Sequence, residues 1–317
     1  MLQSFVRIFK AWTLPIAMVI GVLGYLLYAA LPLSEATRVG VAEVSHLLQP
    51  TLIFLILFLS LCRMEFSSLR LYWWHLWLLL IQLSLCLLMA MPLLVCPDSS
   101  WALFWQGSML CMITPTASAA SVITLRLGGR MESVITYTVL ANILSAATVS
   151  LLFPLVEPHE GLRFLSAFGR IVAHLFPTLI VPCLAAFLVQ RLAPRLCQWF
   201  VRCKGLPFYL WALVLCIAIG ITVKSMFEYE VGWGDVFSLV VASLLCCLLQ
   251  FVLGWIVGVR NGDRISIGQS IGQKNTVVAI WMASSFLNPL VAMVGGFYSV
   301  WQNIINSYQL SIKSKTE

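Results

Sequence analysis

Long runs of apolar residues, each about as long as a membrane-spanning helix, constrain this chain more than any other feature. Leu76–Leu94 and Phe237–Val257 are examples, and neither alternates apolar and polar residues as the strands of an outer-membrane barrel do. A spanning helix needs about 20 mostly apolar residues, because each residue rises about 1.5 Å across a hydrocarbon layer about 30 Å thick. We therefore predict an all-α polytopic membrane protein with about ten spans, near residues 12–31, 47–62, 72–95, 101–125, 133–156, 170–190, 207–226, 236–258, 266–286 and 289–311.

The composition agrees with a chain that lies in lipid. Hydrophobic residues make up 61% of the 317 residues and charged residues only 10%, and the mean hydropathy is +0.97. One soluble core could not bury that much apolar surface. We expect a single transmembrane domain over residues 1–317, in which the first apolar segment is retained because it is longer than the core of a signal peptide.

The basic residues fall mainly on one side of the predicted topology. Lysine and arginine in short loops concentrate on the cytoplasmic side of membrane proteins. With ten spans and both termini in the cytoplasm, 14 of the 19 basic residues lie on that side: Arg7, Lys10, Arg63, Arg70, Arg126, Arg130, Arg191, Arg195, Arg202, Lys204, Arg260, Arg264, Lys313 and Lys315. We predict a protein of the cell (inner) membrane. Topology also explains the net charge of +7, so the charge does not indicate a nucleic-acid partner.

The ten cysteines lie mostly inside apolar spans, with no CxxC pair and no matching histidine ligands. We interpret them as packing residues. Neither a disulfide framework nor a metal centre is expected, and no cofactor is predicted beyond a coupling ion.

Two spans are interrupted by polar residues, which lipid tolerates only where they line a cavity walled by protein. The first interruption runs from Thr114 to Thr124, where Pro115 removes a helix hydrogen bond and is followed by small hydroxyl residues. A proline kink with small residues for close helix packing is the alternative.

The second interruption runs from Ser270 to Thr276 and contains Gly272, Gln273, Lys274 and Asn275. A lysine at mid-membrane costs about 2.5–3.5 kcal/mol on insertion scales, so we expect Lys274 to face a cavity or a partner. Alternatively, the ninth span starts later and Lys274 extends to the interface. A span that starts at Asn275 would, however, be too short before Pro289.

The two interruptions fall in the fourth and ninth of ten spans, which is the same position in two halves of five. An odd number of helices makes the second half insert upside down. Paired broken helices in inverted repeats mark the substrate site of many secondary transporters. We therefore predict two inverted repeats, 12–156 and 170–311, whose fourth and ninth helices break at Pro115 and Gly272 and cross.

The tenth span carries a polar patch, Ser299–Ser307. Its amides Gln302, Asn303 and Asn306 are spaced by three and four residues, so we expect them to share one helix face toward the cavity. Hydrogen bonding between helices is the alternative.

Three stretches resemble the bile acid:sodium symporter family. Pro115–Thr124 resembles the family's Pro-Gly-Gly-Thr-Ala-Ser-Asn-Val stretch, Gly272–Thr276 its Gly-Met-Gln-Asn-Ser, and Ser299–Ile304 its Ser-Val-Trp-His-Asn-Ile, the closest match of the three. The resemblance implies ten helices in two inverted repeats with crossed, unwound helices 4 and 9. It also implies that Ser118, Asn275, Gln302 and Asn303 face the substrate, and that Ser121, Thr138, Ser270, Gln273 and Lys274 occupy the ion or coupling site.

The chain departs from the family at the sodium ligands. Ser270 replaces a glutamate, Lys274 a glutamine, and Gln82 is only an out-of-register match to a third-helix glutamine. The loss of a carboxylate removes charge and a strong oxygen ligand, and an ammonium repels sodium. At most a weak sodium site is expected. We hypothesise that Lys274 replaces one cation, or that it gains and loses a proton during transport because desolvation makes its charged state costly.

The predicted function is a secondary transporter, and not an enzyme, that carries a small organic anion such as a bile acid or another carboxylate by alternating access. Lys274, helix N-termini and the amide stripe favour an anionic substrate. We expect the chain to act as a monomer in the lipid bilayer. Two alternatives stay open: a non-transporting sensor or channel on the same fold, and an intramembrane lipid-modifying enzyme. The latter lacks a carboxylate within the spans.

Overall fold

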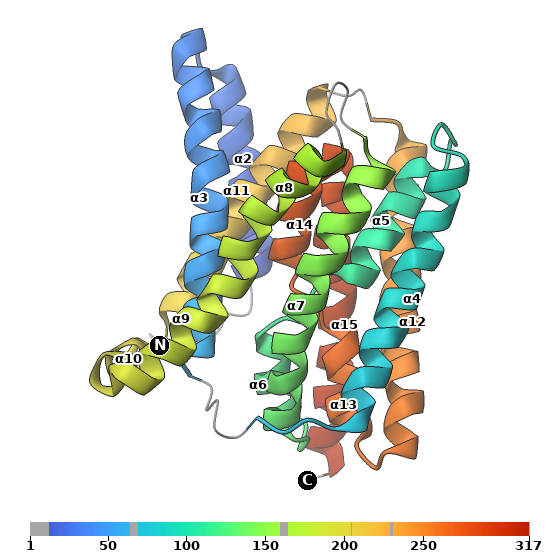
Figure 1. Ribbon diagram of the computed structural model, residues 1–317. Helices are drawn as coiled ribbons and strands as arrows, with labels where there is room; N and C mark the ends of the chain where they lie inside the picture. The colour runs from blue at the N-terminus through green and yellow to red at the C-terminus, as the bar shows by residue number, and fades with distance from the viewer. Residues whose placement is uncertain (1–12, 64–68, 159–163, 204, 229–230, 317) are drawn as a thin grey trace.

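The computed structural model describes residues 13–63, 69–158, 164–203, 205–228 and 231–316, which form a bundle of helices (Figure 1). Arg7, Lys10, Glu160, Arg163, Lys204 and Glu230 lie outside these residues. The helices are α2 (Thr13–Ala30), α3 (Glu35–Leu61), α4 (Trp73–Val95), α5 (Ala102–Ile113), α6 (Ala119–Arg126), α7 (Met131–Val156), α8 (Phe164–Leu175), the π-helix η2 (Phe176–Ile180), α9 (Val181–Leu192), α10 (Pro194–Arg202), α11 (Leu206–Glu228), α12 (Trp233–Arg260), α13 (Arg264–Gly272), α14 (Thr276–Phe286), the 3₁₀ helix η3 (Pro289–Val291) and α15 (Ala292–Thr316).

Five helical stretches within the described residues are long and apolar enough to cross a membrane: Glu35–Leu61, Trp73–Val95, Met131–Val156, Phe164–Leu192 and Trp233–Arg260. The predicted all-α class is confirmed, and these helices indicate an integral membrane protein. Shorter apolar helices, among them Ala102–Ile113 and Thr276–Phe286, accompany them.

The start of one helix and the presence of another differ clearly from the sequence-based expectation. The second span was expected at 47–62, but α3 begins at Glu35, because the Ser34 side chain accepts a hydrogen bond from the Thr37 N–H at 3.3 Å and caps a polar first turn. Helix α10 was not expected, because its nine residues form no apolar run.

The helices form two groups that meet along α14 (Figure 1). In the lateral group, α2 and α3 pack on α11, and α3 also packs on α9. In the central group, α4 packs on α5 and α7, while α12 packs on α5, α13 and α15. Because α14 contacts α3 and α11 as well as α15, the contact between the groups passes beside the second predicted interruption.

Close packing of α12 on α13 depends on a missing side chain at Gly254. A Cβ atom there would lie 2.8 Å from the Gly268 Cα and 3.0 Å from the Ile267 carbonyl oxygen, both of them backbone atoms that cannot rotate away. Glycine at such a position allows two helix backbones to approach each other in a membrane bundle.

Gly254→Val is therefore expected to lower the free energy of unfolding by about 1–3 kcal/mol, as overpacking of a filled interior does. Thermal unfolding in detergent measures the change. Gly234→Val in the same helix is the control, since a Cβ at Gly234 meets nothing within 4 Å. Equal stability of the two variants would contradict the close approach.

Basic residues gather at the end of the bundle where the C-terminus lies (Figure 1): the helix ends there carry Arg126, Arg191, Arg260 and Arg264. At this end, the Arg130 Nε donates to the Asp263 carboxylate at 2.7 Å, and the Arg130 N–H donates to the Ser266 Oγ at 2.7 Å. The hydrogen bond to Asp263 raises the pKa of the guanidinium. This ion pair ties the loop after α6 to the start of α13.

Candidate functional site

Two unwound segments cross between α5 and α6 and between α13 and α14. Helix α5 ends at Ile113 because Pro115 has no N–H to continue it, and residues 114–118 form the first unwound segment. Residues 273–275, after the end of α13 at Gly272, form the second. The segments pair like antiparallel strands: Asn275 N donates to the Pro115 carbonyl at 2.8 Å, and Ala117 N donates to the Gln273 carbonyl at 3.0 Å. Backbone groups released by the breaks thus bond to each other.

The crossing lies at one depth in the bundle. Helices α5 and α14, which lead from it toward one end, have 12 and 11 residues, while α6 and α13, which lead toward the other, have 8 and 9. At about 1.5 Å per residue the two sides add up to about 30 Å, the thickness of the hydrocarbon layer.

The carboxyl end of α5 is closed by side chains from four other segments. Its last carbonyl groups have no partner within the helix and need donors from outside. Gln250 donates to the Cys111 carbonyl at 3.3 Å, Lys274 to Met112 at 3.1 Å, and Gln82 to Ile113 at 3.2 Å and to Thr114 at 3.4 Å. The Ser145 hydroxyl donates to Ile113 as well.

Lys274 is buried to 1% exposure, so it does not extend to the membrane interface. Its ammonium donates to the Met112 carbonyl oxygen, at the negative end of the α5 dipole. Within the described residues no carboxylate lies within salt-bridge distance of it. The positive charge is thus stabilised by the Met112 carbonyl at the end of α5 and not by an acid.

Gln302 of α15 holds the backbone of Lys274 from both sides. The Lys274 N–H donates to the Gln302 Oε1 at 2.9 Å, and the Gln302 Nε2 donates to the Lys274 carbonyl at 3.3 Å. One turn further, Asn306 Nδ2 donates to the Gln273 Oε1 at 3.2 Å. The amides at 302 and 306 therefore fix the segment that carries the lysine.

Asn303 does not share this face, contrary to the expectation from spacing. Its side chain is exposed and donates to the Ser299 carbonyl of its own helix at 2.7 Å. Positions i and i+4 lie on one face of a helix, whereas adjacent residues point about 100° apart. Gln302 and Asn306 are therefore buried together, and Asn303 points elsewhere.

The other predicted residues of the site divide into two sets. Asn275 caps α14, where its Oδ1 accepts a hydrogen bond from the Val278 N–H at 3.4 Å. Ser118 precedes α6, and its carbonyl oxygen accepts a hydrogen bond from the Ser121 hydroxyl at 2.9 Å. In the ion or coupling set, Thr138 donates to Val134 in its own helix at 2.8 Å, while the buried Ser270 Oγ has no hydrogen-bond partner.

The residues of the predicted ion or coupling set include no carboxylate. The hydroxyls of Ser121 and Thr138 keep oxygen lone pairs of the kind that bind hard cations, but they add no negative charge. The charge present is the ammonium of Lys274. The described residues likewise hold no cluster of three or more His, Cys, Asp or Glu side chains that could bind a metal.

Sequence reasoning missed several residues of the crossing. Tyr298 donates to the Gly272 carbonyl at 2.8 Å and accepts from Gln250 at 3.1 Å, and Tyr137 donates to the Gln82 Oε1 at 2.8 Å. Gln82 was named from the sequence as an out-of-register match, and a signal also existed for Gln250, which is a lone amide within a long apolar span. No such signal marked the tyrosines.

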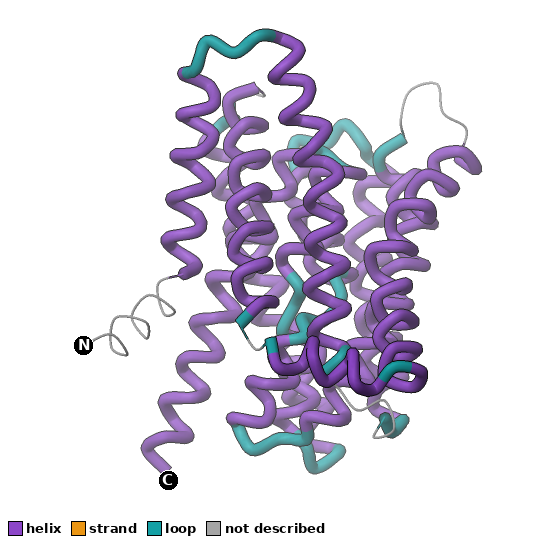
Figure 2. The backbone as a smooth tube through the Cα atoms, turned by 90° about the vertical axis from the view of Figure 1, so that its left-hand side faces the viewer, coloured by secondary structure: helices purple, strands orange, loops and turns teal. Residues whose placement is uncertain are grey.

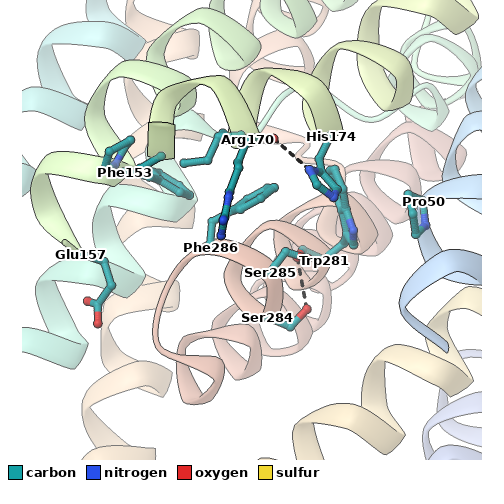
Figure 3. Close-up of a pocket in the computed structure, with 12 residues that line it drawn as sticks. Pro50, Phe153, Glu157, Arg170, His174, Trp281, Ser284, Ser285 and Phe286 are labelled. Atoms are coloured by element: carbon teal, nitrogen blue, oxygen red, sulfur yellow. Dashed lines mark hydrogen bonds between the residues drawn. The ribbon is translucent and has the colours of Figure 1, made fainter. Parts of the chain in front are cut away.

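Two cavities lie on opposite sides of the crossing, between the lateral and central groups. The Glu157 cavity, about 380 Å³, is lined among others by Pro50, Phe153, Glu157, Arg170, His174, Trp281 and Phe286 (Figure 3). The Ser118 cavity, about 410 Å³, is lined among others by Ser60, Arg63, Ser118, Ser121, Ile135 and Trp211.

The two cavities lie at different heights along the same two helices, α3 and α7. On α3, Pro50 and Ser60 are about 15 Å apart, and on α7, Ile135 and Phe153 are about 27 Å apart. The Glu157 cavity lies beside the far end of α14, and the Ser118 cavity beside the start of α6. Each cavity therefore approaches the crossing from a different end of the bundle.

Charge is distributed differently in the two cavities. In Figure 3, Arg170 and His174 of α8 lie near the rings of Trp281 and Phe286, while the Glu157 carboxylate lies apart. That carboxylate accepts a hydrogen bond from Gln106 Nε2 at 2.6 Å. Among the described residues that line the Ser118 cavity, only Arg63 is charged, and it lies beside the hydroxyls of Ser60, Ser118 and Ser121.

The fold and the polar crossing define an all-helical integral membrane protein with a charged site buried in its interior. No protein-family model matches the chain, and a search of curated proteins found no match either.

Proposed function

We propose that the chain is a secondary carrier of the bile acid:sodium symporter type that moves a small organic anion. The observation that carries the proposal is the crossing of two unwound segments around the buried Lys274, with a cavity on each side of it. A carrier needs a site that opens to either side in turn, and broken helices at mid-membrane are where such sites lie.

The proposal includes a finer architecture of ten membrane spans in two inverted repeats, 12–156 and 170–311. In support, α5 and α6 together have the length of one membrane span, and so do α13 and α14 together. The chain also passes through the crossing in opposite directions in the two halves, from α5 to α6 and from α13 to α14 (Figure 1). By the positive-inside rule, the basic end of the bundle faces the cytoplasm.

An anionic substrate agrees with the charges around the crossing. Arg63 and the N-terminus of α6 face the Ser118 cavity, and Lys274 lies at the crossing itself. Arginine and helix N-termini both bind carboxylates. In this account Ser118, Asn275 and Gln302 line the substrate path, whereas Asn303 has no part in it.

Lys274 takes the role of a coupling cation in this proposal. A carrier that depends on sodium needs a cation at the broken helices in its loaded state, and here an ammonium tethered to the chain neutralises the carbonyl groups of α5. Transport is then exchange or uniport, independent of sodium. A lysine that releases its proton during the cycle would instead couple transport to the proton gradient.

The test of carrier function is counterflow in proteoliposomes. Vesicles that contain the full chain are loaded with unlabelled cholate or pyruvate, and entry of the labelled anion is followed. We expect transient accumulation that saturates with concentration. A channel would give flux without saturation or counterflow, and a sensor would give binding without flux; either result would overturn the proposal.

A further inference from the structure

Helix α10 lies across the long helices at the basic end of the bundle (Figures 1 and 2). Its residues divide into three sectors around the helix axis at about 100° per residue. Cys197 and Val201 face the protein, Leu196 and Trp199 point outward, and the third sector holds Arg195, Gln198 and Arg202.

The protein-facing sector fixes α10 on the end of α3. The Cys197 Sγ donates to the Cys62 carbonyl at 3.4 Å, and the ring of Phe200 packs edge-on against Phe58 with centroids 5.2 Å apart. Because these contacts lie at the end of α3, α10 is held at the level where a spanning helix leaves the hydrocarbon layer.

The outward sector is apolar. Leu196 is 47% exposed and Trp199 is 57% exposed, and Leu192, just before α10, is 76% exposed. Tryptophan beside leucine at the end of a spanning bundle is typical of the membrane interface, where the ring lies among the headgroups.

The remaining sector is strongly basic. Arg191, Arg195 and Arg202 are exposed, and the sequence from residue 161 to residue 227 contains no acidic residue. A hollow of about 590 Å³ between α3 and α10 is lined by Arg63 and Arg202 together with the amides of Gln190 and Gln198. The Gln190 Nε2 already donates to the Leu61 and Cys62 carbonyls, at 3.1 and 3.3 Å, so the guanidinium groups are what suits this hollow to a phosphate.

We propose that α10 is an interfacial helix that binds the anionic phospholipids of the leaflet at the basic end of the bundle. Leu196 and Trp199 enter the boundary between headgroups and acyl chains, and Arg195 and Arg202 bind lipid phosphates. An amphipathic helix with arginine on one face and tryptophan and leucine on another binds membranes in this way. The proposal depends on the membrane location of the bundle and not on transport.

The first test measures lipid retention by the full chain. The protein is incubated with equal amounts of phosphatidylglycerol and phosphatidylcholine of the same acyl chains, and bound lipids are counted by native mass spectrometry. We expect phosphatidylglycerol to be preferred, and the preference to fall about fivefold or more in the Arg195→Gln/Arg202→Gln variant. Arg126→Gln/Arg260→Gln, two exposed arginines at the same end, is the matched control. An equal fall in both variants, or none in the first, would overturn the proposal.

The second test locates Trp199 in the reconstituted protein. The difference in fluorescence between wild type and Trp199→Phe isolates this residue from the other tryptophans. We expect phospholipids brominated in the upper acyl chain to quench that difference, and iodide in the water not to. Quenching by iodide alone would place α10 in water and overturn the proposal even if the arginine variant were poorly folded.

Discussion

Lys274→Gln is expected to lower sodium-independent counterflow by about 100-fold. Glutamine is shorter and neutral, so it neither reaches the Met112 carbonyl nor supplies the positive charge at the end of α5. Removal of one partner from a buried, hydrogen-bonded charge typically costs 2–5 kcal/mol, which corresponds to a factor of roughly 30 or more. The initial rate of labelled-anion entry into proteoliposomes measures the loss.

Lys313→Gln is the matched control for this variant. Lys313 also donates its ammonium to a helix carbonyl, that of Arg126, at 2.9 Å, but it lies at the surface. We expect counterflow in Lys313→Gln to stay within twofold of wild type. If added sodium restored flux in Lys274→Gln, the ion would be taking the place of the ammonium, in agreement with our account. Undiminished sodium-independent flux would rule that account out.

Gln302→Met is expected to destabilise the protein by at least roughly 2 kcal/mol. The change keeps the length and apolar volume of the side chain but removes both hydrogen bonds to the Lys274 backbone. Each buried backbone group left without a partner costs about 1–3 kcal/mol. Thermal unfolding in detergent, followed by circular dichroism, gives the change in midpoint and enthalpy.

Asn303→Met, at the neighbouring position, is the control for stability. Asn303 is exposed and bonds only within its own helix, so its loss should change the free energy of unfolding by about 0.5 kcal/mol or less. If Asn303→Met were the more destabilising of the two, the hydrogen bonds between Gln302 and the Lys274 backbone would not contribute to stability as we infer.

Much of the helix layout was readable from the sequence because lipid demands it. A helix in the hydrocarbon layer must satisfy its own backbone, so apolar runs such as Trp73–Val95 mark their helices directly. The polar stretches at Pro115 and Gly272 were visible for the converse reason, because they could be tolerated only if other protein groups paired with them. The structure supplies those groups, and each stretch is largely the partner of the other.

Features outside the apolar runs could not be read in the same way. The polar first turns of α3 depend on a cap at Ser34, and α10 depends on its docking against Cys62 and Phe58. Neither the start of α3 nor helix α10 appears in the sequence as a run of apolar residues.

The partners of the crossing were only partly predictable. Lys274 was identifiable as a buried charge, but its hydrogen bond to Met112 joins residues 162 positions apart, a pairing that only the packing of α5 against the second crossing segment defines. Asn303 was misplaced because composition alone does not say which of two adjacent amides faces inward.

The most direct test of the central claim, that a tethered ammonium replaces the coupling sodium, is anion uptake into proteoliposomes with sodium and proton gradients imposed separately. We predict that an inward sodium gradient gives no more accumulation than an equal potassium gradient. The flux should either be unaffected by both gradients or follow the proton gradient, the latter if Lys274 gains and loses a proton during transport. Accumulation driven by sodium would contradict the account, because it would require a sodium site beside the lysine.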